Sequence, residues 1–198
     1  DIVQSLKGNP YILPDMIPTL SETKHIKLKG KFNILMISSF GVDEPIQEAL
    51  MAMKAFSHDN VYLYVRGNYK KLDNKILNTA PSNVIFTGFL DEQEYINMLF
   101  SCNAILVLTT ASACMLCGCY EAVSARKPLI TSDKDVLREY FTDAVFVDNT
   151  AKGISIGIKK VLDNKSQYED KIELLKEKLI IRWGAQYEHL EQILLSVS

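Results

Sequence analysis

The stretch NVIFTGFLDEQEYINMLFSCNAILVLTT, residues 83–110, decides the fold class. Its first part, NVIFTG, has the β-branched and aromatic residues of a short strand and ends in glycine. Residues 91–102 open with acidic side chains, which favour the amino end of a helix through the helix dipole. Residues 103–110 are a nearly continuous apolar run, as in a strand buried on both faces. The stretch therefore predicts a strand, a helix and a second, parallel strand.

The same alternation extends outward on both sides. Short apolar runs predict further strands, and apolar residues at helical spacing predict further helices. Strands that alternate with helices form a parallel sheet with helices on both faces. The sequence therefore predicts an α/β fold, a doubly wound, Rossmann-like parallel sheet of six strands. The further strands are expected at 32–38, 60–67, 127–133 and 144–149, and the further helices at 45–56, 70–78, 115–125, 135–141 and 151–162.

The two ends of the chain differ from this central domain, which covers residues 25–165. Residues 1–24 carry three prolines spaced by four, which predicts an irregular linker or crossover. Residues 166–198 predict a C-terminal helical tail with a break near Gly184. The chain starts with Asp1 rather than Met, so we expect it to be cut from a longer protein.

The bulk composition limits the class of protein. With 47% hydrophobic and 23% charged residues, it is typical of a soluble globular protein. A formal net charge of −2 gives no basic field that would favour nucleic acid as a partner, and the basic run at 24–31 is interpreted as a solvated edge. No apolar run approaches the roughly 20 residues of a membrane-spanning helix. Four cysteines are too few for a disulfide scaffold in 198 residues, which indicates reduced thiols and a cytoplasmic location.

The candidate site follows from the predicted sheet. In such sheets ligands bind outside the carboxyl ends of the strands. The loops after the strands should therefore meet at one edge. They are residues 38–41, 66–68, 88–90, 109–115 and 131–135.

Three cysteines lie close together in TTASACMLCGCYEA, residues 109–122: Cys114, Cys117 and Cys119. Structural zinc takes four ligands, usually in two paired clusters, and the sequence has no second cluster. The histidines lie in other segments without ligand-like spacing. We therefore predict no metal site and interpret the cysteines mainly as small buried residues.

The same segment begins a predicted helix directly after a buried strand. The amino end of a helix offers free N–H groups and a positive dipole end, which suit a phosphate. Gly118 is interpreted as a small residue that allows close backbone approach. Glu121 would lie about two turns into the helix, where its carboxylate could accept hydrogen bonds from a sugar diol. From spacing alone, a solvated helix glutamate remains the alternative.

Several of these stretches resemble the C-terminal, nucleotide-sugar-binding half of retaining glycosyltransferases of the GT-B fold, family 4. Residues 83–110 resemble that family's strand, acidic-started helix and following strand, and CGCYEAVSARKPLITSD resembles its E-A-(x)4-K-P segment. LREYFTDAVFVDN resembles the stretch that closes the sheet, and NPYILPDMIP the linker between the two domains. The resemblance covers residues 9–165. It implies that an N-terminal domain precedes this chain, and that the tail packs on its own domain or crosses back to that one.

The resemblance also implies residues that bind the nucleotide-sugar donor. Glu121 matches the glutamate that holds the ribose hydroxyls. The other positions match the loop over the diphosphate, a small hydroxyl residue before it, the segment that touches the base, and the turns after the first two strands. The loop over the diphosphate is Met115, Leu116, Cys117 and Gly118, and the small hydroxyl residue before it is Thr110. The segment that touches the base is Gly88, Phe89 and Leu90. The turns after the first two strands are Ser39, Phe40 and Gly41, and Arg66 and Gly67.

The sequence departs from the family pattern in three places. Ala113 stands where a first glutamate, which contacts the donor sugar, is expected. The Gly-Phe-Gly that follows that glutamate is Cys-Met-Leu here. The turn after the first strand lacks the arginine and lysine that bind the diphosphate, and carries Asp43 and Glu44, which would repel it as unpaired carboxylates. The candidate cations to replace that pair are Arg66 and Lys127.

The resemblance implies a hexosyltransferase that moves a hexosyl group from a nucleoside diphosphate sugar to an acceptor hydroxyl, in polysaccharide or glycoconjugate synthesis. It implies no cofactor and no metal. The N-terminal domain would bind an acceptor sugar or lipid-linked glycan and supply part of the catalytic residues, so we expect this chain alone to bind a nucleotide without catalysis. Peripheral association of the full-length protein with the inner face of the membrane is compatible with this setting.

Three other functions stay open. A degenerate, binding-only domain is favoured by Ala113 and the missing cations. A nucleotide-sugar 2-epimerase of the same fold would need its own catalytic carboxylates and histidines. A dinucleotide-dependent oxidoreductase would need Gly-x-Gly-x-x-Gly after the first strand, where SSFGVDE has a single glycine.

Overall fold

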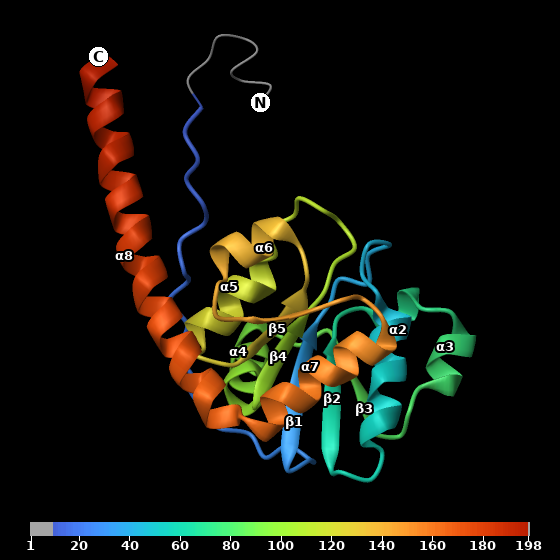
Figure 1. Ribbon diagram of the computed structural model, residues 1–198. Helices are drawn as coiled ribbons and strands as arrows, with labels where there is room; N and C mark the ends of the chain where they lie inside the picture. The colour runs from blue at the N-terminus through green and yellow to red at the C-terminus, as the bar shows by residue number, and fades with distance from the viewer. Residues whose placement is uncertain (1–9, 198) are drawn as a thin grey trace.

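The computed structural model of the chain describes residues 10–197, and within them it contains one parallel sheet of six strands (Figure 1). The strand order is β3-β2-β1-β4-β5-β6, so the direction of winding reverses between β1 and β4. All five neighbouring pairs are parallel. The predicted fold class is confirmed. The strands are β1 Phe32–Ile37, β2 Val61–Arg66, β3 Val84–Gly88, β4 Ala104–Val107, β5 Leu129–Ser132 and β6 Val145–Val147.

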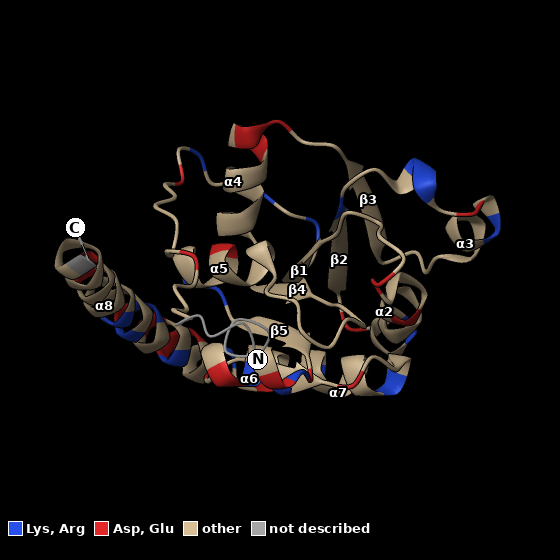
Figure 2. Ribbon diagram, turned by 90° about the horizontal axis from the view of Figure 1, so that it is seen from above, with Lys and Arg blue, Asp and Glu red and all other residues tan. Residues whose placement is uncertain are grey.

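Helices cover both faces of the sheet. α2 and α7 pack on one face and α4 and α5 on the other (Figure 2). Because alternate strand residues point to opposite faces, Ile34 and Met36 of β1 join the first core and Leu35 the second. The helices are α2 Ile46–Ala52, α3 Asn74–Thr79, α4 Glu92–Ser101, α5 Cys117–Ser124, α6 Asp135–Tyr140, α7 Ala151–Asp163 and α8 Lys165–Val197, with short 3-10 helices η1 Met53–Phe56 and η2 Tyr69–Lys71.

The start of α4 shows why the acidic run after β3 forms a helix. The Asp91 carboxylate accepts a hydrogen bond from the Glu94 backbone N at 2.7 Å. The Glu94 carboxylate accepts one from the Asp91 backbone N at 3.2 Å. This reciprocal capping box satisfies N–H groups that the first turn of a helix leaves unpaired.

Two helices differ from their predicted ranges. α5 starts at Cys117 rather than at residue 115, so the segment before it belongs to the loop after β4. The helix expected over 70–78 is divided into η2 and α3, because Leu72 between them is extended. α3 then starts where the Asp73 carboxylate accepts a hydrogen bond from the Lys75 backbone N at 2.7 Å.

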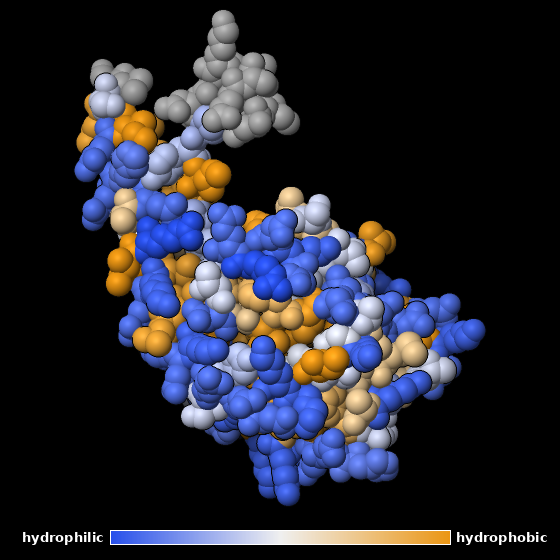
Figure 3. All heavy atoms as spheres, viewed as in Figure 1, coloured by the Kyte–Doolittle hydropathy of each residue, from blue (hydrophilic) through white to orange (hydrophobic). Residues whose placement is uncertain are grey.

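α8 is one uninterrupted helix, so the predicted break near Gly184 is wrong. A Cβ placed on Gly184 would meet no atom within 4 Å, so no close contact requires glycine there. The first half of α8 packs on the domain through the buried Ile172, Leu175 and Leu179. The second half projects from the domain and carries exposed apolar side chains (Figure 3). No helix within the described residues is both long and apolar enough to cross a membrane.

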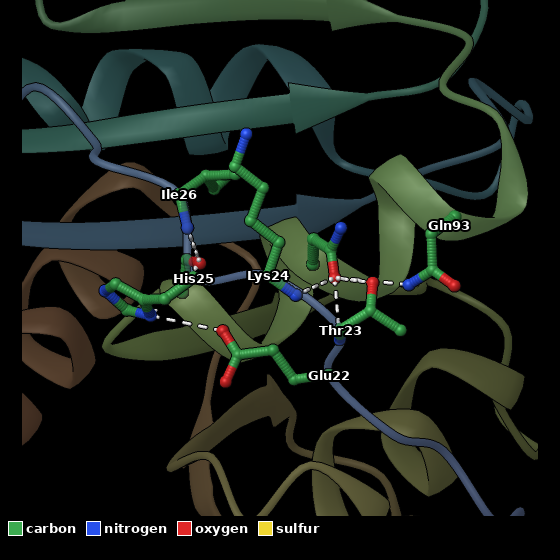
Figure 4. A network of polar contacts seen from close by, with 8 residues as sticks. Glu22, Thr23, Lys24, His25, Ile26 and Gln93 are labelled. Atoms are coloured by element: carbon green, nitrogen blue, oxygen red, sulfur yellow. Dashed lines mark hydrogen bonds and ion pairs between the residues drawn. The ribbon is translucent and has the colours of Figure 1, made fainter.

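Residues 10–31 run along the domain without a helix or strand, and hydrogen bonds attach them to it at several places along their length. The Trp183 indole N–H of α8 donates to the Pro14 carbonyl oxygen at 2.9 Å. The buried Asn97 side chain of α4 accepts hydrogen bonds from the backbone N–H groups of Thr23 and Lys24, both at 3.1 Å (Figure 4). The predicted linker begins at residues 1–9, which lie outside the described residues, and its role as a linker stays a prediction.

Candidate functional site

A cavity of about 640 Å³ lies outside the carboxyl ends of β1, β2 and β4, where the winding of the sheet reverses. Figure 2 is viewed from this edge. The cavity is lined by the loops after β1, β2 and β3 and by the segment that leads from β4 into α5. The fifth predicted loop, residues 131–135, lies beside this segment, because the Lys134 ammonium donates to the Thr110 carbonyl oxygen at 3.0 Å. Four of the five loops therefore meet at one cavity, as a doubly wound sheet predicts.

Most of the predicted donor-binding residues line this cavity. From the loops after β1 to β3 they are Ser39, Arg66, Gly67 and Phe89, and from the segment before and into α5 they are Met115, Leu116, Cys117 and Gly118.

Six predicted residues do not line it, and five of them are loop residues. Phe40 is buried in the core behind the loop, and Leu90 packs against the second core. Gly88 lies in an adjoining hollow. Thr110 is exposed and bonded to the β1 loop through its backbone N, and Gly41 lies in that loop. These residues shape the loops and do not face the cavity.

Arg66, at the end of β2, is the central cation of the site. Its guanidinium lies over the ring of Tyr95 at 4.4 Å and over the ring of Phe89 at 5.2 Å, measured to the ring centroids. Its Nε atom is buried and has no hydrogen-bond partner among the described residues. Because this guanidinium lines the cavity, its positive charge suits an anionic or strongly polar ligand.

Glu121, the predicted ribose-binding residue, lies next to the cavity and not in its wall. The Tyr95 hydroxyl donates to Glu121 Oε2 at 2.5 Å. Burial, and then the neighbouring Glu121 carboxylate, raise the pKa of Tyr95, so this phenol stays protonated and keeps donating. Tyr95 thus links Arg66 to Glu121. The sequence did not reveal this contact, because nothing in the spacing of residues 95 and 121 indicates that they meet.

The two acidic residues of the β1 loop are hydrogen-bonded, so their interpretation as unpaired carboxylates is wrong. The Glu44 carboxylate accepts hydrogen bonds from the backbone N–H groups of Ser39 and Phe40, both at 3.0 Å. The Asp43 carboxylate accepts one from the Thr109 hydroxyl at 2.8 Å. Asp43 therefore joins the loop after β1 to the end of β4, and Glu44 closes its own loop.

Lys71 of η2 also lines the cavity and was missed, although it follows the predicted loop at 66–68 closely in the sequence. Its ammonium donates to the Ser39 carbonyl oxygen at 2.9 Å. Lys127 cannot take this place, because it lines a separate hollow of about 430 Å³ together with residues 25–28, just before β1. Burial there lowers the pKa of Lys127.

The four cysteines divide into two kinds. Cys102 and Cys119 are buried, and burial raises the pKa of each thiol to about 12, so both are packing residues as predicted. Cys114 is half-buried, and Cys117 is exposed and lines the cavity, so the packing interpretation is wrong for Cys117. The described residues contain no group of three or more potential metal ligands.

Gly118 allows a close approach, as predicted, but to the sheet. A Cβ at this position would lie 3.1 Å from methyl groups of both Ile37 and Val107, at the ends of β1 and β4. That distance is tighter than ordinary van der Waals contact. Glycine therefore lets the first turn of α5 sit directly on the strand ends beside the cavity.

A doubly wound parallel sheet with a cavity at the reversal of winding, walled by cations and the start of a helix, defines an α/β domain of the Rossmann-like class. Residues 20–178 match the family described as glycosyl transferases group 1, and the chain belongs to that family. No curated protein matches the chain in sequence.

Several solved structures share the fold. Sucrose-phosphate synthase from Thermosynechococcus elongatus is 17% identical, with a TM-score of 0.67 over 86% of this chain and 47% of that one. Anabaena HepE in complex with UDP and glucose is 12% identical, with a TM-score of 0.67 over 84% of this chain and 49% of that one. A structure of S. aureus TarM that contains UDP is 15% identical, with a TM-score of 0.68 over 93% of this chain and 38% of that one. The chain thus spans less than half the length of these proteins.

Proposed function

We propose that this chain is the donor-binding part of a retaining glycosyltransferase. It would hold a nucleoside diphosphate sugar while its hexosyl group moves to an acceptor hydroxyl, in polysaccharide or glycoconjugate synthesis. The acceptor would be bound by a further domain, since the similar structures are more than twice as long as the part that matches. We propose a cytoplasmic setting for the full-length protein.

One observation carries this proposal: the cavity lies between the first turn of α5 and the two cations Arg66 and Lys71. The amino end of a helix and two positive side chains suit the negative charge of a diphosphate. The same groups would stabilise the diphosphate as it leaves during transfer, which is an electrostatic task that this site could perform without a metal.

The role we propose for Glu121 is to accept hydrogen bonds from the ribose hydroxyls. Tyr95 occupies Oε2, and Oε1 has no hydrogen-bond partner among the described residues. A carboxylate held by one bond from a neutral phenol keeps acceptor capacity for a diol. Tyr95 is then a positioning residue, because it orients Glu121 and carries Arg66 on its ring.

A binding-only domain without transferase activity is the second candidate. Ala113 favours it, because no carboxylate stands at the position that matches the contact with the donor sugar. Such a domain would keep the nucleotide half of the site and lose discrimination between a nucleoside diphosphate and its sugar conjugate. The two candidates therefore differ in sugar recognition.

Calorimetric titration of the chain with UDP, GDP and ADP tests the proposal. UDP comes first, because two of the similar structures contain it. We expect one nucleotide to bind and Glu121→Ala to weaken it at least tenfold, about 1.4 kcal/mol. The control is Glu177→Ala, which removes an exposed carboxylate of α8 away from the cavity. Failure of all three nucleotides to bind, or equal binding by both variants, would contradict the proposed site.

A comparison of the nucleotide with its sugar conjugate then separates the two candidates. A transferase part should bind the conjugate differently from the bare nucleotide, since the hexose has its own contacts. Equal affinity for both would favour the binding-only domain.

A further inference from the structure

The hydrogen-bond donors of the loop after β1 converge on a single carboxylate. Glu44 accepts from the backbone N–H groups of Ser39 and Phe40, each at 3.0 Å. It also accepts from the Ser39 hydroxyl at 2.8 Å and from the Ser38 hydroxyl. Four donors from three consecutive residues therefore surround one anionic group, and Ser38, Ser39 and Glu44 all line the cavity.

The backbone of this loop has the form of an anion-binding concavity. Phe40 has a φ of 57°, a left-handed conformation that is unusual for a bulky residue. Consecutive N–H groups next to a left-handed residue form the concave nests that bind phosphates and other anions. The loop is braced from behind, since a Cβ at Gly67 would lie only 2.2 Å from the Ser38 carbonyl oxygen. The nest is thus fixed by the fold, and the Glu44 side chain occupies it.

The two cations of the cavity come from β2 and η2, and one of them reaches across to the β1 loop. The charged side chains in its lining are Arg66, Lys71 and Glu44. Arg66 has a buried Nε without a hydrogen-bond partner among the described residues. The Lys71 ammonium donates to the neutral Ser39 carbonyl oxygen of the β1 loop at 2.9 Å. Glu44 has its negative charge on the β1 loop. A phosphate in this cavity is therefore attracted to Arg66 and Lys71 and repelled by the Glu44 carboxylate that fills the nest.

We propose that Glu44 is a specificity-determining residue that occupies the phosphate-binding donors of the β1 loop, so that only Arg66 and Lys71 receive the phosphates of a ligand. This inference rests on the proposed function, that the cavity binds a nucleoside diphosphate. Glu44 lowers the affinity of the site for phosphate-bearing ligands and leaves its affinity for the nucleoside unchanged. Removal of the carboxylate opens the nest and removes one like charge.

The test compares a nucleoside diphosphate with its nucleoside and with pyrophosphate, by calorimetry on the wild-type chain and on Glu44→Gln. The matched control is Glu48→Gln, which removes the same charge in the first turn of α2, outside the cavity lining. We expect Glu44→Gln to bind UDP and pyrophosphate about tenfold more tightly than wild type, from the loss of one charge within a few ångströms. Binding of uridine should not change, and Glu48→Gln should behave as wild type. GDP with guanosine, or ADP with adenosine, replaces this pair if the site prefers another base.

Lys71→Met is the second variant. It tests whether the phosphates are received by the cations Arg66 and Lys71, also in the case that Glu44→Gln does not fold. It should weaken the binding of the nucleoside diphosphate about tenfold and leave the nucleoside unaffected. Unchanged or weaker diphosphate binding by a folded Glu44→Gln chain overturns this inference alone, as does an equal change for the nucleoside. Unchanged diphosphate binding by Lys71→Met also overturns it. Failure of every variant to bind any nucleotide overturns the proposed function, and this inference with it.

Discussion

Gly67 is the position where one added methyl group should damage both the fold and the site. Its φ of 130° lies in a region nearly restricted to glycine, and another residue there costs about 1–3 kcal/mol. The Cβ of an alanine would also lie 2.2 Å from the Ser38 carbonyl oxygen and 2.9 Å from the Phe40 ring. The carbonyl is a backbone atom that cannot rotate away, so overpacking adds about 1–3 kcal/mol. We expect Gly67→Ala to lower the free energy of unfolding by about 4 kcal/mol, from the two contributions together.

Gly184→Ala is the matched control, because it makes the same chemical change where the structure predicts the opposite sign. Gly184 lies within the uninterrupted α8, and a Cβ there meets nothing within 4 Å. Alanine in a helix interior is favoured over glycine by about 0.5–1 kcal/mol, so this variant should be slightly more stable than wild type.

Urea unfolding at 25 °C, followed by circular dichroism, measures both free energies of unfolding. Thermal scans should agree, since about 4 kcal/mol corresponds to a decrease in Tm of about 8–16 °C for a domain of this size. A Gly67→Ala chain within about 1 kcal/mol of wild type would refute the close contact between the β1 and β2 loops. A destabilised Gly184→Ala chain would refute the continuity of α8.

Three further predictions concern the thiols and the N-terminal segment. A thiol reagent at pH 8 should label Cys117 in the folded chain and spare the buried Cys102 and Cys119, whose pKa values burial raises to about 12. A nucleotide in the cavity should slow the labelling of Cys117. Labelling of either buried thiol in the folded chain would contradict the packing. From about pH 9 to 12 the unfolded chain loses the two buried thiol protons that the folded chain keeps, so these thiols should make the free energy of unfolding fall as the pH rises. Asn97→Ala leaves two backbone donors without their acceptor, so it should lower the free energy of unfolding in urea by about 1–3 kcal/mol. The control Gln93→Ala removes one exposed donor to the same oxygen and should lower it by less than about 1 kcal/mol.

The fold could be predicted because strands buried on both faces leave a simple signal. β1 is buried over nearly its whole length, so its residues form the apolar run seen at 32–38. The start of α4 was equally predictable, since its capping box uses residues three apart. The predicted break at Gly184 was wrong because glycine occurs both at helix bends and in ordinary helix interiors. The sequence does not distinguish the two, whereas the structure shows no close neighbour at Gly184.

The candidate site could be predicted only as far as the topology determines it. Parallel strands bring the loops that follow them to one edge, and this placed Arg66 and Gly118 correctly beside the cavity. The partners of the charged groups were not predictable. Whether Glu44 turns toward its own loop or toward a ligand depends on the direction of one side chain, which spacing does not reveal. The contact of Tyr95 with Glu121 joins two helices on the same face of the sheet and has no local signal.

Because of these contacts, the two walls of the cavity differ in how many unpaired polar groups they offer to a ligand. The β1 loop is held by Glu44 from within, by Gly67 from behind and by Lys71, which donates to the Ser39 carbonyl oxygen. A loop that is fixed in this way shapes the cavity but offers a ligand few unpaired hydrogen-bond donors. The β2 side carries Arg66, whose stacking on two rings fixes its position while its Nε stays unpaired within the described part of the chain. If the cavity binds the anion proposed above, we expect its recognition to depend on the β2 side and on the first turn of α5. A substitution of Arg66 should then affect ligand binding far more than a substitution of Ser39.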